Sequence, residues 1–580
     1  MKALFRQLGP AFLPYRRAVA WGIGCVVLTN LISLAQPQVL RFAVDDLYRG
    51  VTAEKLGRYA LLLLAIATAA GLFKFAMRIA LLGVSRRIEF DLRARVFDRL
   101  LLQPSSYYQR AGIGDLVARA TSDLAAVRMM LGPGIMYLVN TVVVTLASLA
   151  FLLSISPWLT LVSLLPLPFT SLAMWFFGER IHRGSERIQE QFAKVSARAQ
   201  ESFAGVRVVR SLGRESREIA EFHALHEEYR VRQASLTRVA ALFQPSLAFL
   251  AGLAALLAIA YGGRAVVRDQ ITLGEFVAFT VYLGMLNWPM VALGWIIHLF
   301  QRGAASYARL REVLEAEPEM RSPDSPRTAP ARGAIEVRNL DFTYPGGSTP
   351  VLRGVSLDIP AGSRVAIVGA TGSGKSTLAG LLVRRFDPPS GTVLLDGVDI
   401  RDYELAELRT RFAVVAQEAF LFAGSIGENI VLGGDRDGER STLLAAEAAG
   451  LGPDLAAIPA GLDEPVGERG SRLSGGQRQR VAIARALHRA ARVLVLDDPL
   501  ASVDAFTEAA ILRGLARRAG QATTVIVTHR AAGVEGADQV VVLEDGRVAE
   551  AGPPGVLRAR NGAFARWLRE QELEAELEAS

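Results

Sequence analysis

The chain has 580 residues, of which 51% are hydrophobic, and it carries a formal net charge of +8 and one cysteine. That single cysteine, Cys25, excludes an internal disulfide and a thiolate metal cluster, and its place in an apolar run predicts a packed core thiol. Long apolar stretches lie in residues 1–301, whereas residues 331–580 have the pattern of a soluble α/β domain. Cytoplasmic loops of membrane proteins collect Arg and Lys, so we prefer this interpretation of the basic charge to nucleic-acid binding.

Residues 1–17 are basic and contain five spaced apolar or aromatic side chains. They lack a short apolar core followed by a small-residue cleavage site, so we expect no cleavable signal peptide. The pattern predicts instead an amphipathic elbow that lies on the membrane surface.

Six stretches are apolar and long enough to cross a bilayer, which takes about 20 residues. Residues 129–178 carry no charge at all, and this run is too long for one crossing. Ser156-Pro157 near its middle predicts a tight hairpin between two crossings. We therefore expect one crossing each at 18–40, 59–82, 239–263 and 276–301, and two within 129–178.

Basic residues gather in two of the connecting segments. Residues 84–128 carry 8 Arg, and residues 180–238 carry 12 Arg plus Lys, while 41–58, 156–157 and 264–275 carry far fewer. The positive-inside rule places both basic segments and the N-terminus in the cytoplasm, in a multi-pass protein of the inner (plasma) membrane. Because both segments are polar with few helix breakers, we expect the membrane helices to continue into the cytoplasm. They should turn around near 112–115 and 205–213.

Three polar side chains lie where the second and sixth crossings approach the inner leaflet: Lys74, Arg78 and His298. One interpretation is contact with substrate or a lipid headgroup in a cavity. The other, which we favour, is snorkelling at the interface or a helix already past the bilayer.

Four prolines in residues 316–332 predict a linker. The expected organisation is an elbow at 1–17, a transmembrane domain at 18–315, the linker at 316–332, a nucleotide-binding domain at 333–568 and an acidic C-terminal tail helix at 569–580.

A phosphate-binding loop of the form G-x-x-x-x-G-K-S follows the short apolar strand 365–368 and opens a helical pattern. Its glycines allow backbone N–H groups to wrap phosphates, and the helix N-terminus adds a positive dipole. Lys375 is expected to reach the β- and γ-phosphates of ATP, and the Ser376 hydroxyl to bind Mg²⁺. The residues expected to bind ATP here are Gly369, Thr371, Gly372, Ser373, Gly374, Lys375, Ser376 and Thr377.

A second apolar strand, 493–496, ends in Asp497-Asp498-Pro499. An acidic residue at the carboxyl end of such a strand lies beside the phosphate loop, so Asp497 is expected to hold Mg²⁺ directly or through water.

Between these two motifs stands Leu473-Ser474-Gly475-Gly476-Gln477, followed by Arg478-Gln479-Arg480. This sequence resembles the signature of ABC ATPases, and six crossings ahead of such a cassette resemble an exporter half-transporter. The resemblance implies a membrane α-helical domain, with six transmembrane helices and long cytoplasmic extensions, fused to an α/β P-loop nucleotide-binding domain. It also implies ATP and Mg²⁺ as cofactors, and ATP contacts from Ser474, Gly475, Gly476 and Gln477.

The resemblance assigns further roles, residue by residue. Tyr344 is similar to the aromatic that stacks on adenine, although by itself it would be interpreted as a packed edge tyrosine. Gln417 resembles the glutamine that touches Mg²⁺ and the membrane domain, and His529 resembles the switch histidine that reads the γ-phosphate. Ser502-Val503-Asp504 resembles the D-loop, with Asp504 at the nucleotide, and 468–470 resembles a segment found before the signature in exporters.

One position departs from the family pattern. Working sites carry Glu directly after the Mg²⁺-binding Asp, and here that residue is Asp498. Its carboxylate is one methylene shorter, and a displacement near 1 Å costs on the order of a hundredfold in rate. Asp498 is therefore expected to be a weak catalytic base, while the signature is intact. This combination resembles the degenerate half of heterodimeric exporters, whose signature completes the hydrolysing site of a partner half-transporter with the consensus Glu.

The expected function is ATP-driven export of hydrophobic drugs, lipids or peptides across the bilayer. Two alternatives stay open: a slow homodimeric exporter, and an ATP-binding regulatory or channel-like membrane protein. A soluble ABC protein acting on nucleic acid is disfavoured by the six crossings.

Overall fold

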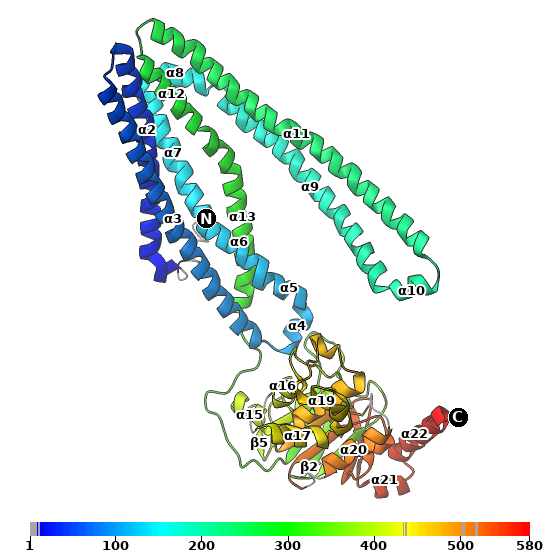
Figure 1. Ribbon diagram of the computed structural model, residues 1–580. Helices are drawn as coiled ribbons and strands as arrows, with labels where there is room; N and C mark the ends of the chain where they lie inside the picture. The colour runs from blue at the N-terminus through cyan, green and yellow to red at the C-terminus, as the bar shows by residue number, and fades with distance from the viewer. Residues whose placement is uncertain are drawn as a thin grey trace. The chain divides into compact units, whose positions relative to one another are not determined.

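The computed structural model describes residues 9, 12–432, 434, 438–500, 505–516 and 520–579. The chain divides into two compact units (Figure 1). The helical unit comprises Met1–Leu101 and Gly114–Ala316, and the α/β unit comprises Leu102–Ile113 and Glu317–Ser580. Most of the expected elbow and the D-loop residues 502–504, Asp504 included, lie outside the described residues.

Six helical segments among the described residues are long and apolar enough to cross a membrane, which confirms the expected number. Their bounds are Leu13–Arg49, Ala53–Leu101, Ile113–Ile155, Pro157–Ala204, Glu215–Val267 and Leu273–Glu315. The helices within them are α2 (Arg16–Arg49), α3 (Ala53–Leu101), α5 (Ile113–Ala118), α6 (Leu124–Met129), α7 (Ile135–Ile155), α8 (Pro157–Leu164), α9 (Leu167–Ala204), α11 (Glu215–Val267), α12 (Leu273–Met285) and α13 (Asn287–Glu315).

The hairpin expected at Ser156-Pro157 separates α7 from α8. Ser156 leaves the helical conformation, and its side chain accepts a hydrogen bond from Leu159 N as an N-cap. Pro157 occupies the first helical position, where its fixed φ is favourable and its missing N–H costs nothing. Cys25 is buried, as expected of a packed thiol.

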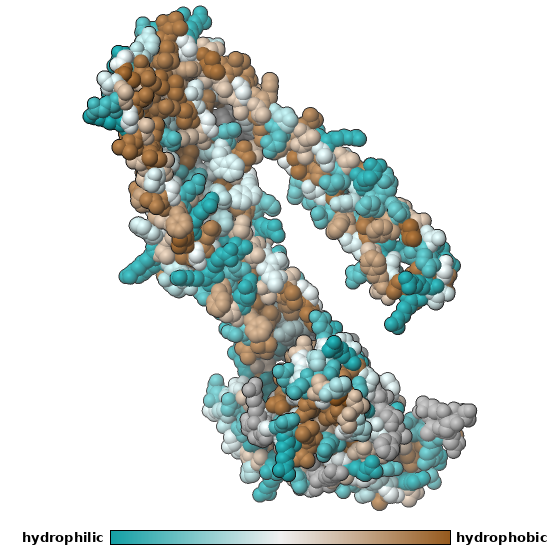
Figure 2. Space-filling model, in the orientation of Figure 1, coloured by the Kyte–Doolittle hydropathy of each residue, from teal (hydrophilic) through white to brown (hydrophobic). Residues whose placement is uncertain are grey.

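The helices are much longer than a bilayer is thick. α11 has 53 residues, so it is roughly 80 Å long at 1.5 Å per residue, against about 30 Å of hydrocarbon. α9 and α11 pack side by side and are joined through α10 (Val206–Ser211), and this α9–α11 arm extends away from α2, α3 and α13 (Figure 1). In Figure 2, hydrophobic side chains gather near α2, α3 and α8, and the α10 end of the arm is more hydrophilic.

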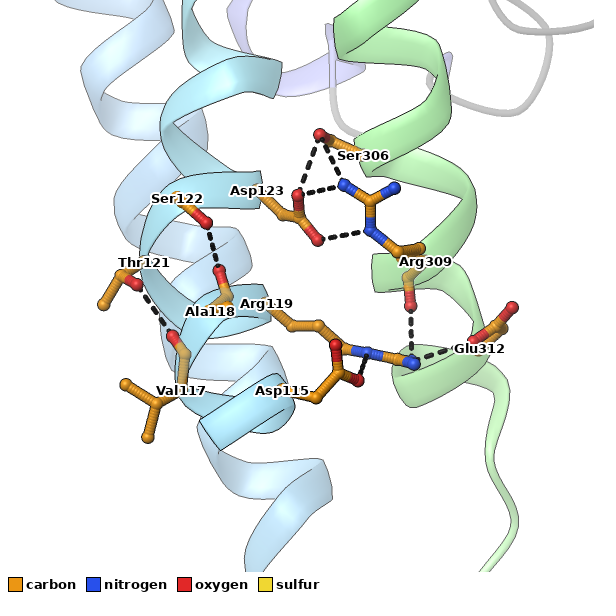
Figure 3. A network of polar contacts seen from close by, with 10 residues as sticks. All are labelled: Asp115, Val117, Ala118, Arg119, Thr121, Ser122, Asp123, Ser306, Arg309 and Glu312. Carbon is orange, nitrogen blue, oxygen red and sulfur yellow. Dashed lines mark hydrogen bonds and ion pairs between the residues drawn. The ribbon is translucent and has the colours of Figure 1, made fainter. Parts of the chain in front are cut away.

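A buried carboxylate joins the third and sixth segments (Figure 3). Asp123 is only 6% exposed, and it accepts hydrogen bonds from Ser306 Oγ at 2.9 Å, Arg309 Nε at 2.9 Å and Arg309 Nη2 at 2.5 Å. One helical turn away, Arg119 pairs with Asp115 and with Glu312, each at 2.8 Å. The interactions Asp123–Arg309 and Arg119–Glu312 join residues about 190 positions apart in the chain. Together they hold α13 against the part of the third segment that carries Asp123.

Two short π-helical segments flank α6, at Arg119–Asp123 and Met130–Gly134. Such segments are rare and are often found at functional positions. Close packing surrounds the second: a Cβ added at Gly132 would lie 2.5 Å from Ser85 Oγ, and one at Gly303 would lie 2.5 Å from Met130 Cβ. Gly132 and Gly303 therefore allow α3, α13 and the second π-helical segment to pack closely.

The α/β unit contains two sheets among its described residues. The six-stranded sheet has the order β10-β9-β3-β8-β7-β6, in which only the β9–β10 pair is antiparallel, and the four-stranded antiparallel sheet has the order β2-β1-β4-β5. The strands of the larger sheet are β3 (Arg364–Val368), β6 (Phe412–Val415), β7 (Val493–Asp497), β8 (Thr523–Val527), β9 (Gln539–Glu544) and β10 (Arg547–Gly552). Those of the smaller are β1 (Ile335–Phe342), β2 (Leu352–Ile359), β4 (Val393–Leu395) and β5 (Val398–Asp399).

The central strands are buried runs of Val, Ile and Leu, which is typical of parallel strands covered on both faces. Ile367 and Asp497 both pair with Val527, so β3, β7 and β8 end at the same level. The residues that follow β3, β7 and β8 therefore lie together at one edge of the sheet. Ligands of parallel sheets bind at this edge, outside the carboxyl ends of the strands. The fold class predicted from the sequence is confirmed.

The helices of the α/β unit are short compared with those of the helical unit. They are α4 (Ser105–Ala111), α14 (Lys375–Leu382), α15 (Leu405–Arg411), α16 (Ile426–Val431), α17 (Glu439–Ala448), α18 (Gly452–Ala457), α19 (Gly475–His488), α20 (Ala505–Ala516), α21 (Pro554–Ala559) and α22 (Ala563–Ala579). α4 is far from the others in sequence, yet it belongs to this unit because Ser106 and Arg110 contact Glu319 at 3.1 and 2.9 Å.

Candidate functional site

The phosphate loop runs from the end of β3 to the start of α14. Gly369 has a φ of +142°, and a Cβ there would collide with Leu543 O. Gly374 has a φ of +99°, and a Cβ there would lie 2.8 Å from Leu352 Cδ2. Only glycine combines positive φ with such close approach, so the sequence G-x-x-x-x-G is required by the backbone path itself.

Lys375 lies inside the curve of this loop and is only 4% exposed. Its Nζ donates hydrogen bonds to Gly369 O at 2.8 Å and to Ala370 O at 2.7 Å. Burial lowers the pKa of the Lys375 ammonium, and the carboxylates of Asp498 and Asp497 act in the opposite direction. The loop thus holds a partly desolvated positive charge, which suits an anionic ligand.

The two residues expected to hold Mg²⁺ are in direct contact. Ser376 Oγ donates a hydrogen bond to Asp497 Oδ1 at 2.9 Å. Burial raises the pKa of Asp497 above its usual value, and the hydrogen bond from Ser376 opposes this shift. The charge of Asp498 raises this pKa further, and that of Lys375 lowers it. A hydroxyl beside a carboxylate is an oxygen-donor set that Mg²⁺ accepts.

Asp498 is held in an uncommon conformation. Its φ is +48°, its N–H donates to Val527 O at 2.9 Å, and the residue is 9% exposed. Among the described residues, the buried Oδ1 of Asp498 has no hydrogen-bond partner. A buried acceptor without a partner is costly, so this atom is suited to a proton or water brought by a ligand.

His529 follows β8 and is half-buried near the same groups. Burial lowers the pKa of the His529 imidazole, and the positive charge of Lys375 lowers it further, against the charges of Asp498 and Asp497. The imidazole is therefore neutral near pH 7, with one nitrogen as donor and the other as acceptor. Gln417 is exposed just beyond β6, the neighbour of β7 in the sheet.

Tyr344 is 38% exposed, so it is not a fully packed tyrosine. Its hydroxyl and Thr377 Oγ1 are 2.9 Å apart, and its ring makes edge contacts with Phe342 and Phe386 at centroid distances of 5.2 Å. The aromatic side chain thus adjoins the helix that opens at the phosphate loop.

The signature residues form the first turn of α19. Ser474 is the N-cap and accepts a hydrogen bond from Gln477 N at 3.2 Å, and Gln477 Oε1 accepts from Ser474 N at 3.0 Å. Ser474 and Gly475 are exposed. In the part of the chain that the structure describes, no hydrogen bond or ion pair joins residues 474–477 to the phosphate loop 369–377.

Two positioning residues escape sequence reasoning. Asp454 accepts a hydrogen bond from Gln477 Nε2 at 2.9 Å and pairs with Arg480 at 2.7 Å, which fixes the start of α19. Arg485, further along α19, donates to Phe420 O at 3.0 Å and to Asn429 O at 2.8 Å. It therefore holds the loop that follows Gln417. The only signal in the sequence is an Arg on the apolar face of a helix, which does not identify its partner.

Comparison with known proteins matches two families along the chain. Residues 19–290 match the family described as ABC transporter transmembrane region, and residues 352–501 match the family described as ABC transporter. The chain is 35% identical to the "Probable multidrug resistance ABC transporter ATP-binding/permease protein YheI" of Bacillus subtilis (strain 168), over 98% of this chain and 97% of that protein.

Two further similarities cover nearly the whole chain. It is 32% identical to the "ATP-dependent lipid A-core flippase" of Vibrio vulnificus (strain YJ016), over 98% of this chain and 97% of that protein. Among solved structures, it is similar to a bacterial Atm1-family ABC exporter with ATP bound, with a TM-score of 0.79, 29% identity and coverage of 96% of this chain and 98% of that chain.

Proposed function

The chain belongs to the ABC transporter family as an exporter-type half-transporter, and from this premise we propose that it is the degenerate-site subunit of a heterodimeric, ATP-driven exporter. The observation that carries the proposal is Asp498. It occupies the position of the catalytic base, where a carboxylate one methylene shorter than Glu holds its water poorly.

The residues of the phosphate loop fit ATP with Mg²⁺. The glycine path, the buried Lys375 ammonium and the unpartnered Asp498 Oδ1 are each suited to a phosphate complex. We assign Lys375 to the β- and γ-phosphates, Ser376, Asp497 and Gln417 to Mg²⁺, and Tyr344 to the adenine ring. When bound, Mg²⁺ neutralises charge on the phosphates.

We assign Asp498 and His529 to the γ-phosphate end of this chain's own site. Neutral His529 can donate one hydrogen bond to a phosphoryl oxygen while its other nitrogen accepts one. Asp498 can accept a proton from water, but its carboxylate is drawn back toward the backbone. The site therefore binds ATP and hydrolyses it slowly.

The signature is assigned to the other site of the pair. Its first turn is exposed, and its N-cap side chain is already ordered by the capping box with Gln477. α19 is 14 residues long, so its N-terminus carries a positive dipole and free N–H groups suited to a phosphate. We propose that Ser474, Gly475 and Gly476 complete a hydrolysing site whose phosphate loop and Glu belong to the partner.

The transported molecule is proposed to be hydrophobic. The relatives named above are a probable multidrug resistance transporter and a lipid A-core flippase, which supports drugs or lipids as substrates. A cavity of about 430 Å³ lies among α8, α9, α11, α12 and α13, and none of the described residues that line it is charged. Positive-inside orientation puts the N-terminus and the α/β unit in the cytoplasm, and the similarity to an Atm1-family ABC exporter supports outward transport.

The test uses the purified full-length chain without a partner, reconstituted in liposomes. We expect little ATPase activity, and we expect Asp498→Glu to raise it at least tenfold, because two signatures are present and only the base is deficient. A wild-type chain that hydrolyses ATP at full rate alone would overturn the heterodimer proposal, because Asp498 would then be a competent base in a homodimer. ATP-dependent uptake of a lipophilic cation into inside-out vesicles of the assembled complex separates an exporter from an ATP-binding channel or regulatory protein.

A further inference from the structure

A basic hollow of about 290 Å³ lies between the two helices of the α9–α11 arm. Four residues from each helix line it: Arg180, Arg183, Gly184 and Arg187 from α9, and Arg232, Ser235, Leu236 and Val239 from α11. Each set has the spacing i, i+3, i+4, i+7, which is one face of a helix. The two helix faces are therefore opposite each other, and arginine is the commonest residue in the lining.

The hollow begins where the apolar part of both helices ends. The uncharged run of residues 129–178 stops two residues before Arg180, and the apolar run of α11 starts at Val239, which itself lines the hollow. Arg180 and Arg187 lie roughly 3 and 14 Å beyond Gly178 along the helix axis. The headgroup layer outside the hydrocarbon is roughly 5–7 Å thick on each side, so the Arg180 end of the hollow lies at headgroup depth and the Arg187 end extends beyond it.

The arginine side chains of α9 lean back toward the apolar end. Side chains on a helix tilt toward its N-terminus, and α9 runs out of the apolar region. The guanidinium of Arg180 accordingly lies 3.6 Å from the ring centroid of Phe176, one turn earlier. Arg183 Nε donates to Glu179 Oε1, also one turn earlier, at 2.6 Å. Both cationic groups are thus directed to the membrane side of the hollow.

Positive charge exceeds negative charge around the hollow. Arg183 pairs with Glu179, and Arg232 pairs with Glu228 and donates to Arg187 O at 3.0 Å. Among the described residues, the side chains of Arg180 and Arg187 form no ion pair. Nearby Glu186 is paired with His182, and Arg238 adds a further cation. Glu190, paired with Lys194, also lies within electrostatic range of Arg232. The four lining arginines, Arg238 and Lys194 therefore stand against four carboxylates: Glu179, Glu186, Glu190 and Glu228.

The hollow owes its floor to a close approach of the helices. A Cβ at Gly184 would lie 2.9 Å from Leu236 Cδ1, so the Leu236 side chain would have to shift to admit a larger residue there. Arg232 bridges the same gap through Arg187 O.

We propose that this hollow binds the phosphate of an anionic lipid headgroup. Arg presents planar, bidentate donors that match phosphate oxygens, and an anionic leaflet attracts such groups. Phe176 and Val239 contact the first acyl carbons. This site is separate from the nucleotide site. The proposed membrane orientation determines only which leaflet supplies the lipid.

The experiment measures lipid binding to the full-length protein in zwitterionic phosphatidylcholine nanodiscs titrated with phosphatidylglycerol, by native mass spectrometry. The double variant R180Q/R187Q should weaken phosphatidylglycerol binding on the order of twentyfold, since each basic group at an anionic surface contributes about fivefold. The matched control R207Q/R214Q removes the same charge near α10, roughly 30 Å or more away along the helix, and should change nothing.

A second variant keeps the result decisive if the double variant is unstable. Ser235→Glu places a carboxylate in the hollow at an exposed helix position, and it should weaken phosphatidylglycerol binding without changing the low affinity for phosphatidylcholine. Equal phosphatidylglycerol affinity in wild type, R180Q/R187Q and Ser235→Glu would overturn the proposal. Displacement of phosphatidylglycerol by millimolar inorganic phosphate would also overturn it, because the ligand would then be free phosphate.

Discussion

Ser376 Oγ and Asp497 Oδ1 are 2.9 Å apart although 121 residues separate them in the chain. The contact exists because β3 and β7 both flank β8 and end at one level. It joins the phosphate loop to the acidic strand, and the buried Lys375 and Asp498 lie near the same point.

Replacing Lys375 by Ala should weaken ATP binding at this chain's site by at least tenfold, because the loop loses its only ammonium group. The measurement is titration of a fluorescent ATP analogue against the purified assembled complex, in which the partner's site serves as an internal reference. Lys194→Ala, at an exposed lysine of α9 paired with Glu190, is the control. Unchanged binding at both sites would remove Lys375 from its assigned role.

Asp498 and Ser474 should differ sharply in their effect on turnover. Asp498→Asn alters a site that is already slow, so the assembled complex should keep most of its steady-state ATPase activity. Ser474→Arg places bulk and positive charge at the exposed N-cap of α19, against the phosphate held by the partner, and should abolish most ATPase activity and vesicle transport.

The same two variants identify which site is degenerate. ATP should remain bound at this chain's own loop in Ser474→Arg, as measured by retained radiolabelled nucleotide. If Asp498→Asn stops turnover and Ser474→Arg spares it, the degenerate site belongs to the other subunit.

Asp123 and Arg309 should stabilise the helical unit as a pair. Arg309→Met leaves the buried Asp123 carboxylate without its main partner. Because the Arg309 side chain is 47% exposed, the cost should be roughly 1–2 kcal/mol, less than that of breaking a fully buried pair. Asp123→Asn with Arg309→Met should cost clearly less than the sum of the two single changes. Thermal unfolding of the four proteins in one detergent gives this coupling, and strict additivity would show that the contact contributes nothing.

His529 should make stability depend on pH below neutrality. Its folded pKa is lower than its unfolded value of about 6.5, so the unfolded chain binds more protons in the interval between them. Stability therefore falls as the pH falls from about 6.5 through the folded pKa, and is unaffected by this group above that interval. In His529→Gln, the thermal unfolding midpoint should depend less on pH between pH 6.5 and 5 than it does in the wild type. An equally steep profile in the variant would assign the pH dependence to other groups.

Local patterns determine much of this protein. Apolar run lengths fix six crossings because hydrocarbon thickness sets the length of a crossing helix. Ser156-Pro157 predicts its hairpin because an N-cap and a first-position proline are local effects. The loop 369–377 and the signature 473–477 can be recognised because phosphate binding uses consecutive backbone groups, and Asp498 is visible as a substitution at a fixed place in a motif.

Contacts between distant segments are decided only by the tertiary structure. Three such contacts are Asp123 with Arg309, Arg485 with the backbone after Gln417, and Ser106 with Glu319. Each depends on which segments of the chain pack together. The spacing of residues along one helix shows which face a side chain is on, but it does not identify the residue that it contacts. The basic hollow is of this kind as well. In the sequence, the arginines that line it are ordinary charges in a polar segment: Arg180, Arg187 and Arg232. They line one hollow only because the antiparallel packing of α9 and α11 brings two helix faces together at Gly184. A binding site needs side chains from different segments to converge, and no single stretch of sequence encodes that convergence.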